Sequence, residues 1–279
     1  MVSLFQPRMT SPAPIQQPRG DYPDAVPDRL AGGTPTALKN DLEALLGAAK
    51  VHTRALDLVR YASDFSPYRL VPQVVVNPRS PEEVAAVLDY ARRTGHTVTF
   101  RAAGTSANGQ ALSDDILVDV RAGWTGATVE DDGRRLRVRP GTTVGMANAI
   151  LARHGTRLGP DPASSAACTV GGVIADNSSG FAAGVTQTAA VTLRSATVVL
   201  PSGTIVDTGA PDADERLAAA APELVAELSR IKDEIRADGT LSARIRHKFS
   251  IKNTNGYRLD AFLVADTPAG ILTRLLVCS

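Results

Sequence analysis

The chain has 279 residues, with 30 basic and 29 acidic side chains and a formal net charge of +1. This length provides for one large domain or two smaller ones. The balanced charge and an aromatic share of 4% exclude the basic, base-stacking surface of a nucleic-acid-binding protein. Two distant cysteines and four scattered histidines form neither a disulfide framework nor a zinc site, so we expect no metal and a reducing cytoplasmic compartment.

The N-terminal part is predicted to contain a disordered leader and a helical segment. Residues 1–34 are rich in proline and lack the apolar core of a secretory signal. Residues 35–66 form the helical segment, in which residues 35–46 place four leucines on one helix face. Residues 51–62 fit either a second amphipathic helix or a strand followed by a turn. No apolar run approaches the roughly 20 residues that a membrane-spanning helix needs.

A strand–helix–strand unit is predicted next. Three valines at 74–76, bounded by prolines, indicate a short buried strand. Ser80 suits the N-cap of a helix that Gly95 ends. The apolar alternation of residues 97–100 predicts a second strand, and residues 116–120 predict a third.

The loop of residues 101–110 lies between the last two predicted strands and reads Arg-Ala-Ala-Gly-Thr-Ser-Ala-Asn-Gly-Gln. Its side chains are mostly small, so a ligand can approach the backbone closely. Successive backbone N–H groups in such a turn form a nest for an anion. The residues alone fit a loop that cradles a phosphate or pyrophosphate and a plain surface loop equally well.

The second half of the chain repeats the alternation of hairpins and helices. Residues 128–139 form a hairpin around an Asp-Asp-Gly turn, and Thr142 is predicted to cap the helix that follows. Residues 193–208 form a second hairpin. Residues 212–236 are helical, with one break at Pro222.

A second stretch of small side chains covers residues 158–180. Thr169 is predicted to cap a short turn, in which Gly171 and Gly172 allow a ligand or a strand to approach closely. Stretches of this length without regular structure are usually functional in a compact domain.

Five motifs resemble the FAD-binding (PCMH-type) domain of the vanillyl-alcohol oxidase superfamily and follow one another in the order found in that family, over about residues 68–279. The first covers the entry at 72–84 and the loop 101–110. The others resemble the D-lactate dehydrogenase/glycolate oxidase branch in particular, at residues 159–164, 168–180, 200–203 and 252–257.

The resemblance implies an α+β fold in which two subdomains, about 67–121 and 122–279, hold FAD between them. In that family the first loop holds the pyrophosphate by backbone N–H groups. The two later stretches of small residues line the isoalloxazine ring and the ribityl chain, and the strand around Val206 lies by the adenine. The cofactor-binding residues that the resemblance implies are Arg101, Ala102, Ala103, Gly104, Thr105, Ser106, Gly109, Gln110, Pro160, Asp161, Ser164, Thr169, Gly171, Gly172, Ala175, Asn177, Ser179, Gly180 and Val206.

Non-covalent binding of FAD is expected. Some relatives attach FAD to a histidine of the first loop, whereas this chain has Thr105 at that position and no histidine between residues 97 and 153. Relatives also carry Arg-Tyr-Gly-like and Asp-Asn-like elements where this chain has residues 184–190, which leaves flavin contacts from that segment open.

In relatives, the apolar run that lies near the C-terminus of this chain is expected to lead into a further strand and a substrate-binding cap domain. This sequence stops at Ser279. The expectation is therefore a PCMH-type fold whose last strand and cap domain are missing, from a truncated product or from one part of a split enzyme whose partner chain carries the cap.

The function that the resemblance implies is that of the FAD-binding part of a 2-hydroxy-acid dehydrogenase of the D-lactate or glycolate type. A hydride would pass from the substrate α-carbon to flavin N5, and electrons would continue to an acceptor such as a quinone. The alternative is a non-catalytic flavin-binding module that is active only with a partner chain. The expected location is cytoplasmic, with a peripheral position at the membrane left open.

No residue of the sequence identifies the catalytic base. His154 fits a surface or capping role better than a catalytic one. Cys168 fits a small buried hydrophobe better than a reactive thiol. Lys252 and Asn253 lie in a predicted turn, and the sequence gives little reason to expect that they contact substrate or flavin. The basic residues at 244–248 fit a solvated face better than a binding surface.

Overall fold

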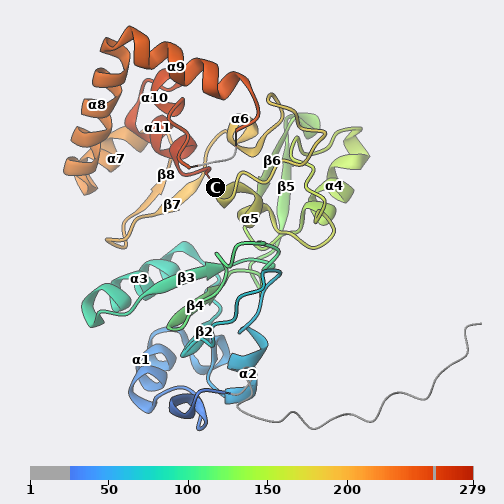
Figure 1. Cartoon of the computed structure of the whole chain (residues 1–279), viewed down its shortest axis with the longest axis vertical. Helices are drawn as coiled ribbons and strands as arrows, with labels where there is room; N and C mark the ends of the chain where they lie inside the picture. Colours follow the sequence, from blue (N-terminus) through green and yellow to red (C-terminus); the bar gives the residue numbers. More distant parts are fainter. Residues whose placement is uncertain (1–25, 254–255, 279) are drawn as a thin grey trace, which may run out of the picture.

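The computed structural model describes residues 26–253 and 256–278. Figure 1 shows a sheet with its helices at one end, a group of helices around a hairpin at the other, and a second hairpin at the side. Most of the predicted disordered leader, residues 1–25, lies outside the described residues. Residues 26–34 differ from the prediction, because the 3-10 turn Asp28–Leu30 places Leu30 fully buried in an apolar cluster.

A four-stranded sheet with three helices forms the N-terminal end. Its elements are α1 (Thr36–Leu46), β1 (Val51–His52), α2 (Ala55–Arg60), β2 (Val74–Val76), α3 (Pro81–Thr94), β3 (Val98–Arg101) and β4 (Ile116–Asp119). The strand order is β1-β2-β4-β3, with β2, β4 and β3 parallel and β1 antiparallel to β2. Helix α3 supplies the crossover that a parallel connection needs. Residues 51–62 thus contain a strand and then a helix.

Alternate residues of the sheet face two separate cores, as the period of two in a strand requires. Val74 and Val76 pack in one cluster with leucines of α1 and Val87 of α3. Val75 and Leu117 pack on the other face with Leu30 and Leu58. Both faces are covered, so all three valines of β2 are fully buried, and the predicted buried strand is confirmed.

Helix α3 confirms the predicted start and stop signals. Ser80 Oγ accepts a hydrogen bond from the backbone N–H of Glu83 (3.3 Å), and Gly95 ends the helix with a φ of 77°. Strand β3 then returns the chain to the sheet, beside β4. The loop 101–110 therefore leaves from the edge where the parallel strands end.

A hairpin and a helix follow at the side of the molecule: β5 (Ala127–Glu130), β6 (Arg135–Val138) and α4 (Val144–Leu151). The hairpin is as predicted, but the N-cap is Thr143 and not Thr142, since Thr143 Oγ1 accepts from Met146 N (3.1 Å). Thr142 is fully buried, and its hydroxyl bonds to the N–H and C=O of Gly126 (2.9 and 3.0 Å). Because Thr142 is used in the contact with Gly126, the adjacent Thr143 caps the helix.

Thr143→Ala should lower the free energy of unfolding by about 1 kcal/mol, because the hydroxyl that caps α4 is lost. Thr143→Ser keeps the hydroxyl and should restore most of the difference. Urea unfolding followed by circular dichroism measures both changes. Equal midpoints for wild type and the alanine variant would contradict the assigned cap.

Two short helices, α5 (Val170–Ala175) and α6 (Ala189–Thr192), lie near the middle of the molecule (Figure 1). As predicted, Thr169 caps α5, its Oγ1 accepting from Gly172 N (3.3 Å). Side chains of α4, α5 and α6 form one apolar cluster, which also contains the fully buried Val277. The chain therefore returns to the middle of the molecule after its C-terminal helices.

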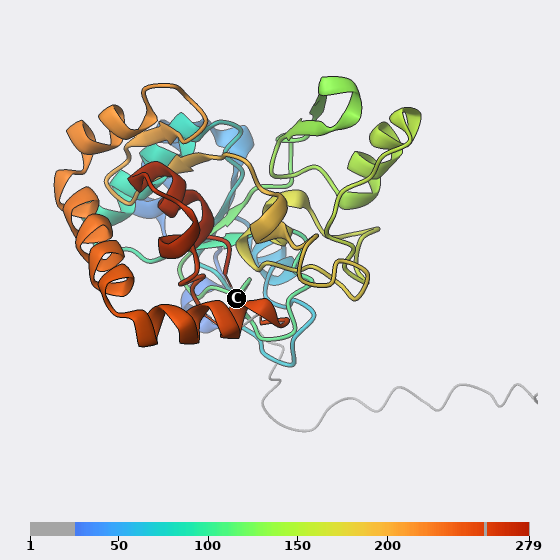
Figure 2. The same cartoon turned by 90° about the horizontal axis from the view of Figure 1, so that it is seen from above.

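The C-terminal end consists of a hairpin surrounded by helices, seen from above in Figure 2. Its elements are β7 (Thr197–Val199), β8 (Ile205–Asp207), α7 (Ala213–Ala220), α8 (Pro222–Ala237), α9 (Gly239–Ser250), α10 (Ala261–Val264) and α11 (Pro268–Leu275). Pro222 breaks the predicted helical stretch because it occupies the first position of α8, where its missing N–H costs nothing. The basic residues at 244–248 are exposed on α9 around the buried Ile245.

Three further 3-10 turns complete the described elements: η2 (Ala48–Lys50), η3 (Asp131–Gly133) and η4 (Ala152–His154). Among the described residues, no helix combines the length and the apolar character needed to cross a membrane.

Candidate functional site

The loop 101–110 presents a run of unused backbone donors at the edge of the sheet. Within the described residues, the N–H groups of residues 102–107 donate no hydrogen bond. Gly104 (φ 71°) and Gly109 (φ 78°) have left-handed backbone conformations, which glycine adopts without strain. Ser106 Oγ bonds to Gln110 Oε1 and accepts from Asn108 N (3.3 Å), which closes the second half of the loop. Such a run of free donors is a binding surface for an anion.

The side chain of Arg101 is tied to the segment that ends α2. It is 8% exposed, and its Nη1 and Nη2 donate to the carbonyls of Tyr61 (3.1 Å) and Ser63 (2.8 Å). Burial, and then the positive charge of Arg121, lower the pKa of the guanidinium. Of the other predicted loop residues, Thr105 and Gln110 are exposed, while Ala102, Ala103, Gly104, Ser106 and Gly109 are half-buried.

The start of α5 packs directly against this loop. A Cβ on Gly172 would lie 3.1 Å from the Cβ of Ala102, and one on Gly171 would lie 2.7 Å from the Cβ of Pro140. The N–H groups of Val170, Gly171 and Gly172 are already bonded, to Thr142 O, Pro140 O and Thr169 Oγ1. The two glycines therefore serve close packing, and the free donors beside α5 belong to the loop.

The predicted segment 160–164 lies along the predicted segment 177–180. The N–H of Asp161 donates to the carbonyl of Ser179 (3.0 Å). Gly180 (φ 68°) allows the contact, because a Cβ there would lie 1.8 Å from the carbonyl oxygen of Asp161. Pro160 is buried, Ser164 is half-buried and Ala175 is exposed.

The side chains of Asn177 and Ser179 serve the fold. Asn177, which has a left-handed φ of 49°, accepts from Ala190 N through Oδ1 (3.1 Å). Ser179 Oγ donates to Asn177 O (2.9 Å) and accepts from Ala189 N (3.4 Å). The two side chains thus bind the first N–H groups of α6. Val206 lies elsewhere, buried in the core of the C-terminal helices.

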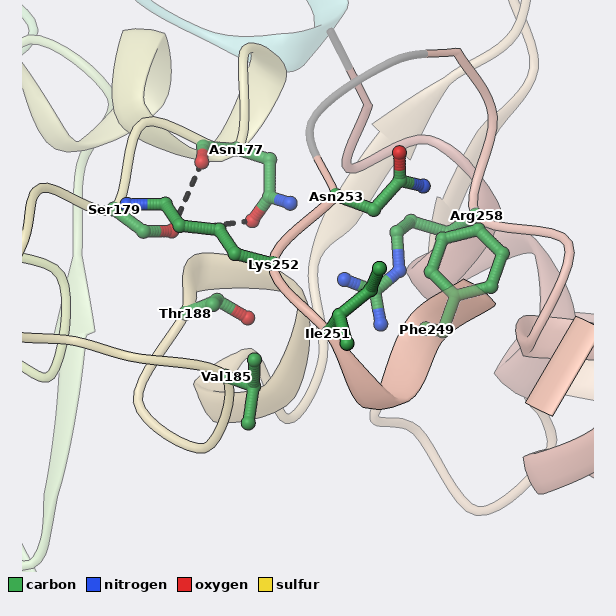
Figure 3. A pocket seen from close by; sticks show the side chains of 9 residues that line it. All are labelled: Asn177, Ser179, Val185, Thr188, Phe249, Ile251, Lys252, Asn253 and Arg258. Carbon is green, nitrogen blue, oxygen red and sulfur yellow. Dashed lines mark hydrogen bonds between the residues drawn. The ribbon is translucent and has the colours of Figure 1, made fainter. Parts of the chain in front are cut away.

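A small pocket, open to solvent, lies between residues 177–188 on one side and residues 249–253 with Arg258 on the other (Figure 3). Thr188 Oγ1 and Asn253 Nδ2 line it, and neither of these buried atoms has a hydrogen-bond partner among the described residues. Lys252 Nζ ties the two segments together, since it donates to Gly180 O (2.6 Å) and lies over the ring of Phe181. The pocket can bind a polar atom of a ligand. Thr188 belongs to residues 184–190, the segment for which the resemblance left flavin contacts open.

Cys168 and His154 occupy structural positions. Cys168 is 5% exposed in the middle cluster, and burial raises the pKa of its thiol. This matches the predicted role as a buried hydrophobe. His154 is exposed in η4, and its Cβ lies close to Gly133 of the hairpin turn.

Comparison with known proteins identifies a family that part of this chain matches. Residues 72–209 match the model of a family described as "FAD binding domain". Over 163 residues the chain is 31% identical to the glycolate oxidase subunit GlcD of Escherichia coli (strain K12), covering 55% of this chain and 32% of that protein. Over 181 residues it is 33% identical to the D-2-hydroxyglutarate dehydrogenase of Pseudomonas putida (strain ATCC 47054), covering 62% and 18%. The chain thus spans a third or less of these relatives.

Among solved structures, the chain is similar to p-cresol methylhydroxylase with bound substrate. The TM-score is 0.52 at 19% identity, and the match covers 66% of this chain and 39% of that one. At this identity the similarity concerns the fold alone, which is the α+β fold described above.

Proposed function

Residues 72–209 of this chain belong to the FAD binding domain family, with a PCMH-type fold and FAD as cofactor, and on that premise we propose that the chain is the FAD-binding part of a flavin-dependent 2-hydroxy-acid dehydrogenase. Glycolate and D-2-hydroxyglutarate, which appear in the names of the relatives, are both 2-hydroxy acids. The substrate class is proposed from that shared chemistry.

The unused N–H groups of residues 102–107 carry the proposal. A pyrophosphate needs several donors at close range and small side chains around them, and this loop supplies free donors among small residues. The loop has Thr105 where some relatives have the histidine that attaches FAD. Because a threonine has no imidazole to form that bond, non-covalent binding is favoured. The packing of Gly172 on Ala102 brings the stretch 169–180 beside the loop, where its backbone can line the rest of the cofactor.

When bound, the flavin would accept a hydride from the α-carbon of the hydroxy acid. The residues of this chain would bind and orient the cofactor: the loop 102–107 through its N–H groups, and the segments 160–164 and 177–180, joined by the hydrogen bond from Asp161 N–H to Ser179 O, by lining it. Thr188 Oγ1 and Asn253 Nδ2 offer the pocket of Figure 3 two hydrogen-bonding groups for a polar atom of the ring or the substrate.

Gly104→Ala should raise the dissociation constant of FAD about tenfold or more, because the methyl group would lie 2.6 Å from Arg101 Nη2 and would displace the loop. Gly155→Ala is the matched control. Gly155 has a similar φ of 68°, and its added Cβ would meet no other described part of the chain within 4 Å, so its variant carries the same backbone strain outside the loop. Titration of the apoprotein with FAD, followed by quenching of flavin fluorescence, gives both constants. A chain that does not bind FAD, or equal constants for both variants, would refute this assignment of the loop.

The same preparation tests the substrate class. Anaerobic addition of glycolate, D-lactate or D-2-hydroxyglutarate should bleach the absorbance of bound flavin if the chain is sufficient for turnover. Tight FAD binding without bleaching by any of the three supports the flavin-binding module that needs a partner chain.

A further inference from the structure

A segment outside the matched family region runs along the candidate pyrophosphate loop. Residues 61–68 precede residue 72, where the family match begins. At one end of the loop, the carbonyls of Tyr61 and Ser63 accept hydrogen bonds from the guanidinium of Arg101 (3.1 and 2.8 Å). In the middle, the N–H of Phe65 donates to the carbonyl of Gly104 (2.9 Å).

The contact continues to the far end of the loop. A Cβ on Gly109 would lie 2.9 Å from Cδ2 of Tyr68 and 3.5 Å from Oγ of Ser66. The segment is itself held in a turn, because Asp64 Oδ1 accepts from Ser66 N (2.7 Å) and Ser66 Oγ accepts from Tyr68 N (3.3 Å). Residues 61–68 therefore form a fixed surface behind the loop from Arg101 to Gly109.

The charge of Arg101 lies directly behind the turn of the loop. A Cβ on Gly104 would lie 2.6 Å from Nη2 of Arg101, so the guanidinium and this turn are in contact. Within the described residues, Arg101 makes no ion pair, and its buried Nε has no hydrogen-bond partner. The carboxylates of Asp64 and Asp119 and the guanidinium of Arg121 are the charged groups that act on it. A buried cation without a direct counter-charge is costly, and an anion on the other side of the loop would offset that cost.

We propose that Arg101 is a positioning residue of the cofactor site, which fixes the loop 102–110 to the segment 61–68 and supports a bound pyrophosphate by its charge. This proposal rests on the binding of FAD at the loop. It extends the functional site to residues 61–68, which contact the loop from its back and do not touch the cofactor.

The test compares Arg101→Met, Arg101→Lys and the control Arg79→Met by FAD titration of the whole chain at several salt concentrations. Arg79 also lies behind a left-handed glycine, Gly123 (φ 74°), but it is exposed and outside the loop. Arg101→Met should raise the dissociation constant about tenfold or more and weaken its salt dependence, because a charge near the pyrophosphate is lost. Arg101→Lys should keep the salt dependence with a smaller rise, since lysine cannot donate to both carbonyls in the same geometry. Arg79→Met should bind FAD like wild type.

A native dissociation constant and salt dependence for Arg101→Met would overturn the proposal while leaving FAD binding by the chain intact. If wild type fails to bind FAD, the proposed function fails first. If Arg101→Met does not fold, as judged by its thermal melt, Tyr68→Ala decides. Tyr68 is 60% exposed, so its truncation should leave the melt unchanged and raise the FAD constant about threefold through loss of its contact with Gly109. An unchanged FAD dissociation constant in a folded Tyr68→Ala chain would refute the proposed support of the loop by residues 61–68.

Discussion

Gly180→Ala is expected to prevent the native structure from forming at 37 °C, even before cofactor binding is considered. The new Cβ would lie 1.8 Å from the carbonyl oxygen and 2.5 Å from the carbonyl carbon of Asp161, and both are backbone atoms that cannot rotate away. The N–H of Asp161 is bonded to Ser179 O, so the segments would have to separate to admit the methyl group. We expect a loss of about 4 kcal/mol or more in the free energy of unfolding.

Gly184→Ala is the matched control for this effect. Gly184 also has a left-handed φ, 53°, and lies in the same stretch of the chain, but no atom of the described residues outside its chain neighbours is within 4 Å of the added Cβ. It should show only the backbone strain of an L-residue in this region, about 1–2 kcal/mol. Thermal melts of the two apoproteins measure the difference. Similar melting temperatures would mean that the two segments are not paired as described.

Asp119→Ala should lower the free energy of unfolding by about 2–4 kcal/mol, because a buried acceptor of four hydrogen bonds is removed. Asp119 is 1% exposed and accepts from Tyr61 Oη (2.9 Å) and from the backbone N, Nε and Nη2 of Arg121 (2.8, 3.2 and 3.0 Å). Burial, together with the negative charge of Asp119, raises the pKa of Tyr61. Removal of the carboxylate should therefore also bring the phenol pKa closer to its ordinary value.

Asp89→Ala controls for the loss of a carboxylate that binds two guanidinium groups. Asp89 accepts from Arg92 (2.7 Å) and Arg93 (2.8 Å) on the exposed face of α3, where solvent screens the pairs. Its variant should melt close to wild type. Urea unfolding gives the stability, and absorbance titration of the phenolate at alkaline pH gives the tyrosine pKa. Equal destabilisation by both substitutions would contradict the burial of Asp119.

The elements that local signals encode were predicted well from the sequence. Ser80 and Gly95 bound α3 because capping depends on groups within one turn of the helix end. Thr142 shows the limit of such signals. Its hydroxyl is engaged by Gly126, 16 residues away, and no local pattern distinguishes it from Thr143. The run of free N–H groups in the loop agrees with the anion-cradling loop, which the residues alone fitted no better than a plain surface loop.

The contacts of residues 61–68 with the loop were not predicted. They run mainly through backbone carbonyls and an N–H, which carry no side-chain signature in the sequence. Asn177 and Ser179 were assigned to the cofactor by resemblance, whereas their side chains bond to the start of α6. Their contribution to FAD binding, like that of the other assigned residues, stays a prediction for the titrations above.

The return of Val277 to the middle cluster has a consequence for the order of folding. The sheet clusters draw on residues 26–120 and the C-terminal cluster on residues 198–275, so each can form from a continuous piece of chain. The middle cluster spans residues 136–193 but also contains Val277. During synthesis it can be completed only after the C-terminal helices have left the ribosome. The region that carries α5, beside the loop, should therefore gain full protection from hydrogen exchange only with the C-terminal helices in place, although most of its residues are synthesised earlier.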